Sequence, residues 1–192
     1  MKKRIAMLLC AAAVSASLIT GCGDHSADKS AAKQEAGEEK GTDQEAADKT
    51  AALIDAIYVQ EWTDKTDEQC AEAKKSWDAL TEEQKALVEG ENADPDYFGR
   101  DTGDASKDDP RNQDEIGEKE LLVVSFGTSF NDSRVEDIKG IEDALQEANP
   151  DWSVRRAFTA QIIINHVKAR DGEKIDNMQQ ALDRAVGNGV KN

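Results

Sequence analysis

The sequence is poor in histidine, cysteine and basic residues, and these shortages exclude some classes of function. Its 192 residues include only two histidines and three cysteines. Lysine and arginine number 24 against 40 aspartates and glutamates, which gives a formal net charge of −16. A chain without a basic stripe cannot displace many counterions from phosphates, so we expect no nucleic-acid partner.

Residues 1–21 have the pattern of a secretory signal. Three cations at 2–4 precede an apolar run over 5–19, which is short for a membrane-spanning helix. The run ends in LITGC at 18–22, which resembles a bacterial lipobox, and an ordinary signal with an incidental cysteine is the alternative. We therefore predict that lipid on Cys22 anchors an exported protein to the outer face of the cell membrane.

Cysteine is too scarce to form a disulfide within the processed chain. Cys10 would leave with the signal and Cys22 would carry lipid, so only Cys70 would remain. Cys70, Ala73 and Trp77 share helical spacing, which favours a packed core cysteine over a reactive thiol.

Aromatic and branched aliphatic residues are missing from residues 22–50, which consist mainly of Ala, Glu, Lys, Asp, Gly, Ser, Gln and Thr. Such a segment has little apolar surface to bury, so we predict a flexible stalk there. His25 lies within it without co-ligands nearby. Most of the negative charge lies between Cys22 and Lys119, because residues 120–192 hold 12 acids and 9 bases.

Residues 51–90 show apolar residues at helical spacing and predict a small module of three helices. Two pairs have the spacing of a capping box, Thr66 with Gln69 and Thr81 with Gln84. Gly90 stands where a helix would end.

Residues 91–118 predict a polar, acidic linker, because Gly, Pro and Asp recur through them without apolar periodicity. The carboxylates over 101–109 are compatible with calcium, but the spacing lacks the glycine and glutamate of an EF-hand loop. A solvated linker is therefore the preferred interpretation.

The last segment, residues 119–192, has the pattern of an α/β fold. The continuous apolar run at 121–126 predicts a buried parallel strand, and 153–158 predicts a second strand. Helical spacing follows each strand, with three helices expected around 135–145, 162–167 and 175–186. The next element after these would be another strand.

The turn after the first predicted strand is rich in glycine and hydroxyl side chains. It reads SFGTSFNDSR over 125–134, which places a glycine, several hydroxyls and free amides before a helix. This arrangement suits an anion, although it is neither a Walker loop nor a nucleophile elbow. Simple helix capping explains the same residues.

Three blocks in this segment resemble the N-terminal part of the anaerobic-type sirohydrochlorin cobalt chelatases of the class II chelatase family. The blocks are LLVVSFGTSFNDSR, RRAFTAQIII and RDGEKIDNMQQAL, in the family's order and spacing. Ala160 departs from the family, which commonly has serine there, and this puts one substrate contact in doubt.

The resemblance implies two similar α/β lobes with a tetrapyrrole in the cleft between them, and a function in inserting Co²⁺ during cobalamin biosynthesis. The donors expected to hold the tetrapyrrole are on the hydroxyl-rich turn and two arginines, namely Ser125, Gly127, Thr128, Ser129, Arg134 and Arg156. No catalytic residue or metal ligand of the family maps onto this chain, and the cobalt ligands are expected beyond residue 192. His166 is interpreted as a structural or surface histidine.

Two strands and three helices make a small core, so the sequence predicts a truncated α/β segment that is inactive by itself. Two other hypotheses remain. An exported protein of this fold would bind a tetrapyrrole or metal and pass it to a transporter without catalysis. Alternatively, the segment is a remnant, and the stalk and helical module serve only for surface display.

Overall fold

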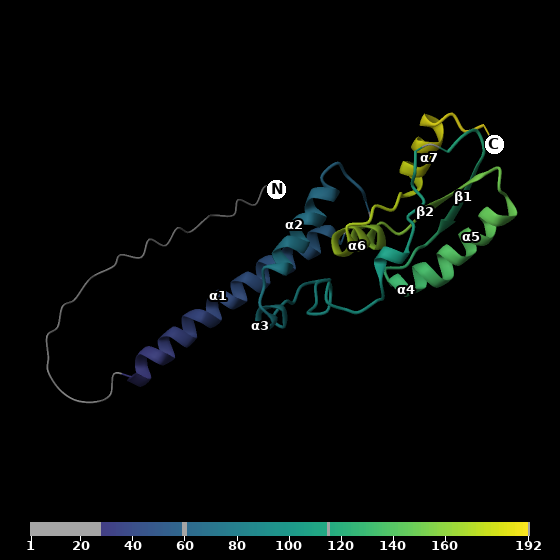
Figure 1. Cartoon of the computed structure of the whole chain (residues 1–192). Helices are drawn as coiled ribbons and strands as arrows, with labels where there is room; N and C mark the ends of the chain where they lie inside the picture. Colours follow the sequence, from purple (N-terminus) through teal and green to yellow (C-terminus); the bar gives the residue numbers. More distant parts are fainter. Residues whose placement is uncertain (1–27, 59–60, 115, 192) are drawn as a thin grey trace, which may run out of the picture. The chain divides into compact units, whose positions relative to one another are not determined.

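The computed structural model describes residues 28–58, 61–114 and 116–191 and divides into two units, Met1–Gly37 and Glu38–Asn192. All contacts given below lie within the second unit. It combines helices with a small parallel sheet, so the predicted α/β class is confirmed (Figure 1). Among the described residues, no helix is long and apolar enough to cross a membrane. The predicted signal, Cys22 and His25 lie outside the described residues.

The helical module consists of α1 (Asp28–Ile57), α2 (Thr66–Asp78) and the single turn α3 (Glu82–Lys85). Its core gathers apolar side chains from α1, α2 and the chain that follows α3, including Ile54, Ile57, Trp77 and Phe98. Cys70 is fully buried in this core, as predicted. Burial raises the pKa of its thiol to about 11, so the sulfur is protonated and unreactive at neutral pH.

The predicted stalk is wrong where the structure describes it, because residues 28–50 belong to the continuous helix α1. Alanine, glutamate, lysine and glutamine are strong helix formers even without apolar periodicity. The last turns also pack: Ala47, Thr50 and Ala51 are buried, and the Thr50 hydroxyl lies 2.8 Å from that of Ser76 on α2. The packed module therefore starts before residue 51.

Only one of the two predicted capping boxes forms. Thr81 and Gln84 cap α3 reciprocally, as expected. Thr66 is instead the first residue of α2, and its hydroxyl accepts the backbone N–H of Thr63. Gly90 does not end a helix, because α3 stops at Lys85 and the Gly90 N–H bonds to the Ala93 carbonyl.

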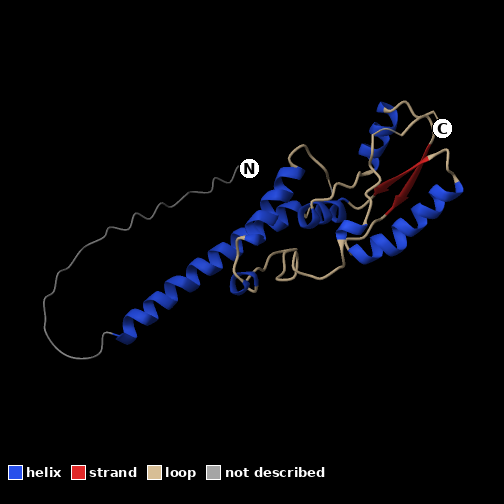
Figure 2. Cartoon of the chain, viewed as in Figure 1, coloured by secondary structure: helices blue, strands red, loops and turns tan. Residues whose placement is uncertain are grey.

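The sheet pairs β1 (Glu120–Ser125) with β2 (Ser153–Phe158) in parallel, with Glu120 opposite Ser153 and Ser125 opposite Phe158. Both strands start within one residue of their predicted positions. The crossover is a continuous helical stretch of α4 (Asn131–Ser133), the π-helical η2 (Arg134–Ile138) and α5 (Lys139–Ala148). Figure 2 shows the two strands beside this crossover.

Two further helices follow β2, as the sequence predicts. Helix α6 (Gln161–Asp171) ends at Gly172, whose φ of 74° is left-handed and suits glycine. Helix α7 (Met178–Gly187) starts later than expected, at a capping box of Asn177 and Gln180. Several apolar side chains around the sheet remain exposed, namely Val124, Phe126, Ile141, Leu182 and Val186.

The predicted module, linker and α/β segment are not separate packing units, because contacts cross the boundaries between them. Helix α2 lies against α6, and Ala169 of α6 belongs to the module's core. The Asn165 side chain donates to the carbonyl of Ile57 at 2.8 Å, and the Cys70 thiol donates to the Asn165 carbonyl. Residues 91–118, which include the short 3₁₀ turn η1 (Ala105–Lys107), are also partly buried. The part of the module within Glu38–Asn192 therefore packs against the α/β segment.

Candidate functional site

The turn predicted to receive a ligand lies where both strands end. In a parallel pair the carboxyl ends share one edge, so the segment after β1 meets the segment after β2. Two backbone bonds join these segments: the Thr159 N–H donates to the Ser125 carbonyl at 2.9 Å, and the Ala160 N–H donates to the Phe126 carbonyl at 3.3 Å. The predicted site is therefore at the edge of the sheet that open α/β folds use for ligands.

Gly127 is required by the shape of this turn. Its φ is 93°, in the region that side chains disfavour, and a Cβ there would lie 2.4 Å from the Phe158 ring. The glycine thus lets the chain pass close over the end of β2.

Ser125, Thr128 and Ser129 stand on this turn as predicted, and all three are partly exposed. The Thr128 hydroxyl accepts the N–H of Phe130 at 3.2 Å, which holds the turn in shape. In the described part of the chain, no acceptor faces the backbone N–H groups of Gly127, Thr128 and Ser129. The turn therefore offers amides and hydroxyls that are free to bind carboxylates or phosphates.

Arg134 was expected to reach the ligand, but the structure buries its side chain completely. Its Nε donates to Asp108 at 2.9 Å, and its Nη2 donates to Glu173 at 3.0 Å and to Asn131 at 2.6 Å. A guanidinium in this environment holds the start of the crossover helix against its neighbours. The arginine supports the turn rather than contacting a ligand.

Arg156, the second arginine that was expected to hold the tetrapyrrole, is likewise fully buried. Its side chain is paired within the protein. It forms two hydrogen bonds with Glu142 on α5, both of 2.8 Å, and two with Asp108, of 2.7 and 2.9 Å. Burial alone would lower the pKa of Arg156, but the two carboxylates outweigh it and raise that pKa. Its charge is already balanced inside the fold.

Asp108 joins the two arginines, although the sequence pattern assigned it to a solvated linker. Burial alone would raise the pKa of its carboxyl, but the bonds from Arg156 and Arg134 keep it below its usual range. A third buried arginine, Arg155, pairs with Asp176 at 3.1 Å. Adjacent arginines on a buried strand are the one sequence signal for this network, because buried cations need carboxylate partners.

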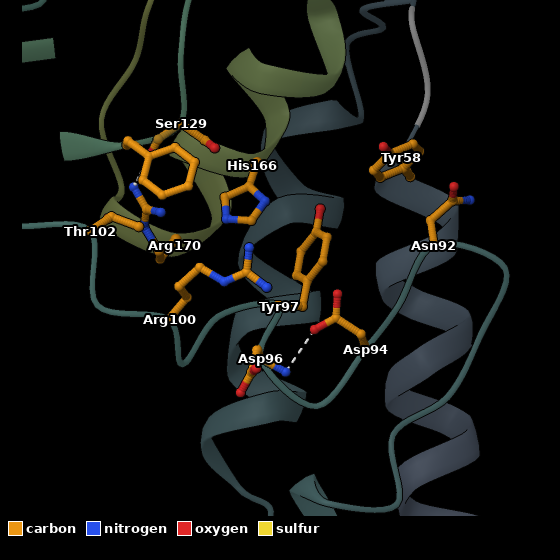
Figure 3. A pocket seen from close by; sticks show the side chains of 11 residues that line it. Tyr58, Asn92, Asp94, Asp96, Tyr97, Arg100, Thr102, Ser129, His166 and Arg170 are labelled. Carbon is orange, nitrogen blue, oxygen red and sulfur yellow. Dashed lines mark hydrogen bonds between the residues drawn. The ribbon is translucent and has the colours of Figure 1, made fainter. Parts of the chain in front are cut away.

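A separate cavity lies beside the turn and is lined by Ser129 and Phe130 on one side (Figure 3). His166 of α6 also lines it, with its ring 4.5 Å from that of Tyr97. Burial and the neighbouring Arg170 lower the pKa of His166 to about 4, so its imidazole is neutral at pH 7. Within the described ranges no three His, Cys, Asp or Glu side chains are grouped to hold a metal ion.

Comparison with known proteins places the similarity in the segment that carries this site. Residues 119–192 match the family model described as cobalt chelatase (CbiK). A sirohydrochlorin cobaltochelatase of Salmonella typhimurium (strain LT2) is 42% identical over 73 residues. That match covers 38% of this chain and 28% of the relative, so the chain spans well under half of the relative's length. No solved structure matches the chain.

Proposed function

Because residues 119–192 are a segment of the cobalt chelatase (CbiK) type, we propose that the protein is a cobalt chelatase, a lyase that inserts Co²⁺ into sirohydrochlorin in anaerobic cobalamin biosynthesis. The observation that carries the proposal is the family match over the β1 turn. All three blocks that suggested the family lie within the matched residues.

Metal insertion needs groups that hold the tetrapyrrole still and groups that deliver the metal and accept pyrrole protons. The turn over 125–129 supplies the first kind, because its amides and hydroxyls can hold the carboxylates of the ring's side arms. Co²⁺ is the substrate metal here, and the described residues offer no grouped ligands for it. We assign no metal-binding or proton-accepting role to His166, whose ring packs against Tyr97 and Phe98.

The test is a spectroscopic assay of the full gene product with sirohydrochlorin and Co²⁺. We expect the tetrapyrrole spectrum to change faster than in the uncatalysed reaction, over many turnovers. Ser125→Ala removes one hydroxyl from the turn and should raise the KM for the tetrapyrrole about 10-fold, as loss of a hydrogen bond to a charged group would. Ser106→Ala, in an exposed turn of η1, is the matched control and should leave KM unchanged.

The same assay separates catalysis from binding. Tight binding of the tetrapyrrole or of Co²⁺ without turnover would instead support the exported carrier that hands its ligand to a transporter. If the assay showed no binding and no acceleration, both proposals would be contradicted.

We also propose that the protein is exported and anchored through lipid on Cys22. The support is the LITGC pattern after a basic and apolar leader. In cells, Cys22→Ser should abolish incorporation of a labelled fatty acid and release the protein from the membrane fraction, whereas Cys10→Ser should change neither. Unchanged labelling in Cys22→Ser would refute the anchor.

A further inference from the structure

The proposed chelatase function leaves unused the cavity of about 180 Å³ beside the β1 turn. Its wall combines three parts of the chain: Tyr58 after α1, residues 92–102, and the Ser129 and His166 region of the α/β segment (Figure 3). All of them belong to the unit Glu38–Asn192. A tetrapyrrole is far too large for this space, which is smaller than the roughly 300–1,000 Å³ of typical ligand pockets.

Tyr97 lines this cavity and carries a buried hydroxyl. Its side chain is 7% exposed, and among the described residues no hydrogen-bond partner is found for the hydroxyl. The ring is held between His166, at 4.5 Å, and Phe98, at 4.7 Å, so the hydroxyl cannot simply turn away. Buried hydroxyls without partners are uncommon and need an explanation, such as a ligand that completes the bond.

The cavity wall also includes an exposed guanidinium that forms no ion pair with the described residues. Arg100 lines the space, and in the described ranges no carboxylate lies within ion-pair distance of it. The other guanidinium, Arg170, is already used, because it donates to the Ser129 carbonyl at 2.7 Å and to Asp171 at 2.6 Å. Arg100 is therefore the cation available to a ligand.

Donors dominate the remaining wall. The hydroxyls of Thr102 and Ser129 and the neutral imidazole of His166 can each donate a hydrogen bond. Two carboxylates also line the cavity: Asp94 accepts the N–H of Asp96 at 2.7 Å, and both aspartates are exposed, as Arg100 is. The surplus of hydrogen-bond donors favours a ligand that brings acceptor atoms.

We propose that this cavity is a carboxylate-binding site in which Tyr97 and Arg100 hold the anion. The carboxylate would belong to a small free acid or to a side arm of a larger molecule that reaches past Ser129. Because Ser129 lies on both the β1 turn and the cavity wall, a bound carboxylate would touch the turn directly. The proposal rests on the cavity alone and does not require chelatase activity.

The experiment is a titration of the full chain with succinate at pH 7, followed by NMR of the histidine rings. The chain has two histidines, so His166→Gln identifies the ring signals of His166. We expect saturable shifts of these signals with succinate and none with methylammonium, which has the opposite charge. A porphyrin polycarboxylate in a parallel titration shows whether a side arm can also enter.

Three variants test the assignment of residues. Tyr97→Phe should weaken succinate binding about 10-fold while raising the melting temperature of the free protein, because it removes an unpaired buried hydroxyl. Arg100→Gln should also weaken binding about 10-fold. Lys107→Gln, which removes an exposed cation from the same segment, should leave the affinity within about twofold.

Some results would overturn the proposal. These are the absence of saturable shifts with succinate, equal affinity in Tyr97→Phe and the unchanged chain, or shifts with methylammonium as large as those with succinate. If the unchanged chain bound succinate but showed no chelatase activity, that result would contradict the proposed function and leave the cavity proposal standing.

Discussion

Arg156→Met should lower the free energy of unfolding by about 3–5 kcal/mol, because it removes four hydrogen bonds and one cation from two buried carboxylates. Among the described residues, Asp108 would keep only Arg134 as an ion-pair partner, and Glu142 would keep only Arg111 at 3.3 Å. Asp108 and Glu142 have fully buried side chains, and each receives two hydrogen bonds from Arg156. Methionine fills a similar volume, so the loss is mainly electrostatic. Urea denaturation of the full chain measures the change.

Two further variants test whether the loss comes from the buried ion pairs. Lys191→Met removes an exposed partner of Glu118, and should change stability by no more than about 0.5 kcal/mol. In the Arg156→Met background, Glu142→Gln should recover part of the loss, because it removes a buried charge whose remaining cation, Arg111, lies 3.3 Å away. A loss for Arg156→Met as small as that for Lys191→Met would show that the network contributes little to stability.

Gly127→Ala should destabilise the chain by about 2–4 kcal/mol and change the shape of the β1 turn. The added Cβ would enter the Phe158 ring at 2.4 Å, and the φ of 93° would strain any L side chain. Because the ring is fully buried, it cannot move aside freely. The free energy of unfolding and the backbone NMR shifts of Thr128 and Ser129 report the two effects.

Gly140→Ala is the matched control for this substitution. Gly140 lies in α5, and nothing stands within 4 Å of its added Cβ. Alanine there should stabilise the helix by about 0.5–1 kcal/mol, so the two substitutions should change stability in opposite directions. If Gly127→Ala were neutral, the turn would be more adaptable than its close approach to Phe158 indicates.

These expectations bear on how the site works. The buried ion pairs of Asp108 join the crossover helix to β2, and Gly127 lets the turn pass close to Phe158. A turn held by both features is ordered before any ligand binds, which lowers the entropic cost of binding.

The sequence by itself determined the elements of the α/β segment and the residues on its turn. The run over 121–126 and the segment 153–158 predicted both strands, which pair in parallel. The expectation that the first strand is buried was wrong, because β1 is only half-buried and Val124 is exposed. Helix α6 ends at Gly172 for a local reason, since left-handed backbone favours glycine. The position of Ser125, Gly127, Thr128 and Ser129 at the strand end followed from order along the chain.

Only the tertiary structure decided which charged residues are buried in ion pairs and which lie at the surface. The local sequence around Arg134 and Arg156 does not distinguish a buried arginine from a substrate-binding one. Their carboxylate partners are up to 48 residues away in the chain. The stalk prediction failed for a related reason, because Ala47 and Thr50 are held by contacts with α2 that no local pattern reveals. Local periodicity records which residues can form an element, whereas pairing between distant residues depends on how those elements pack.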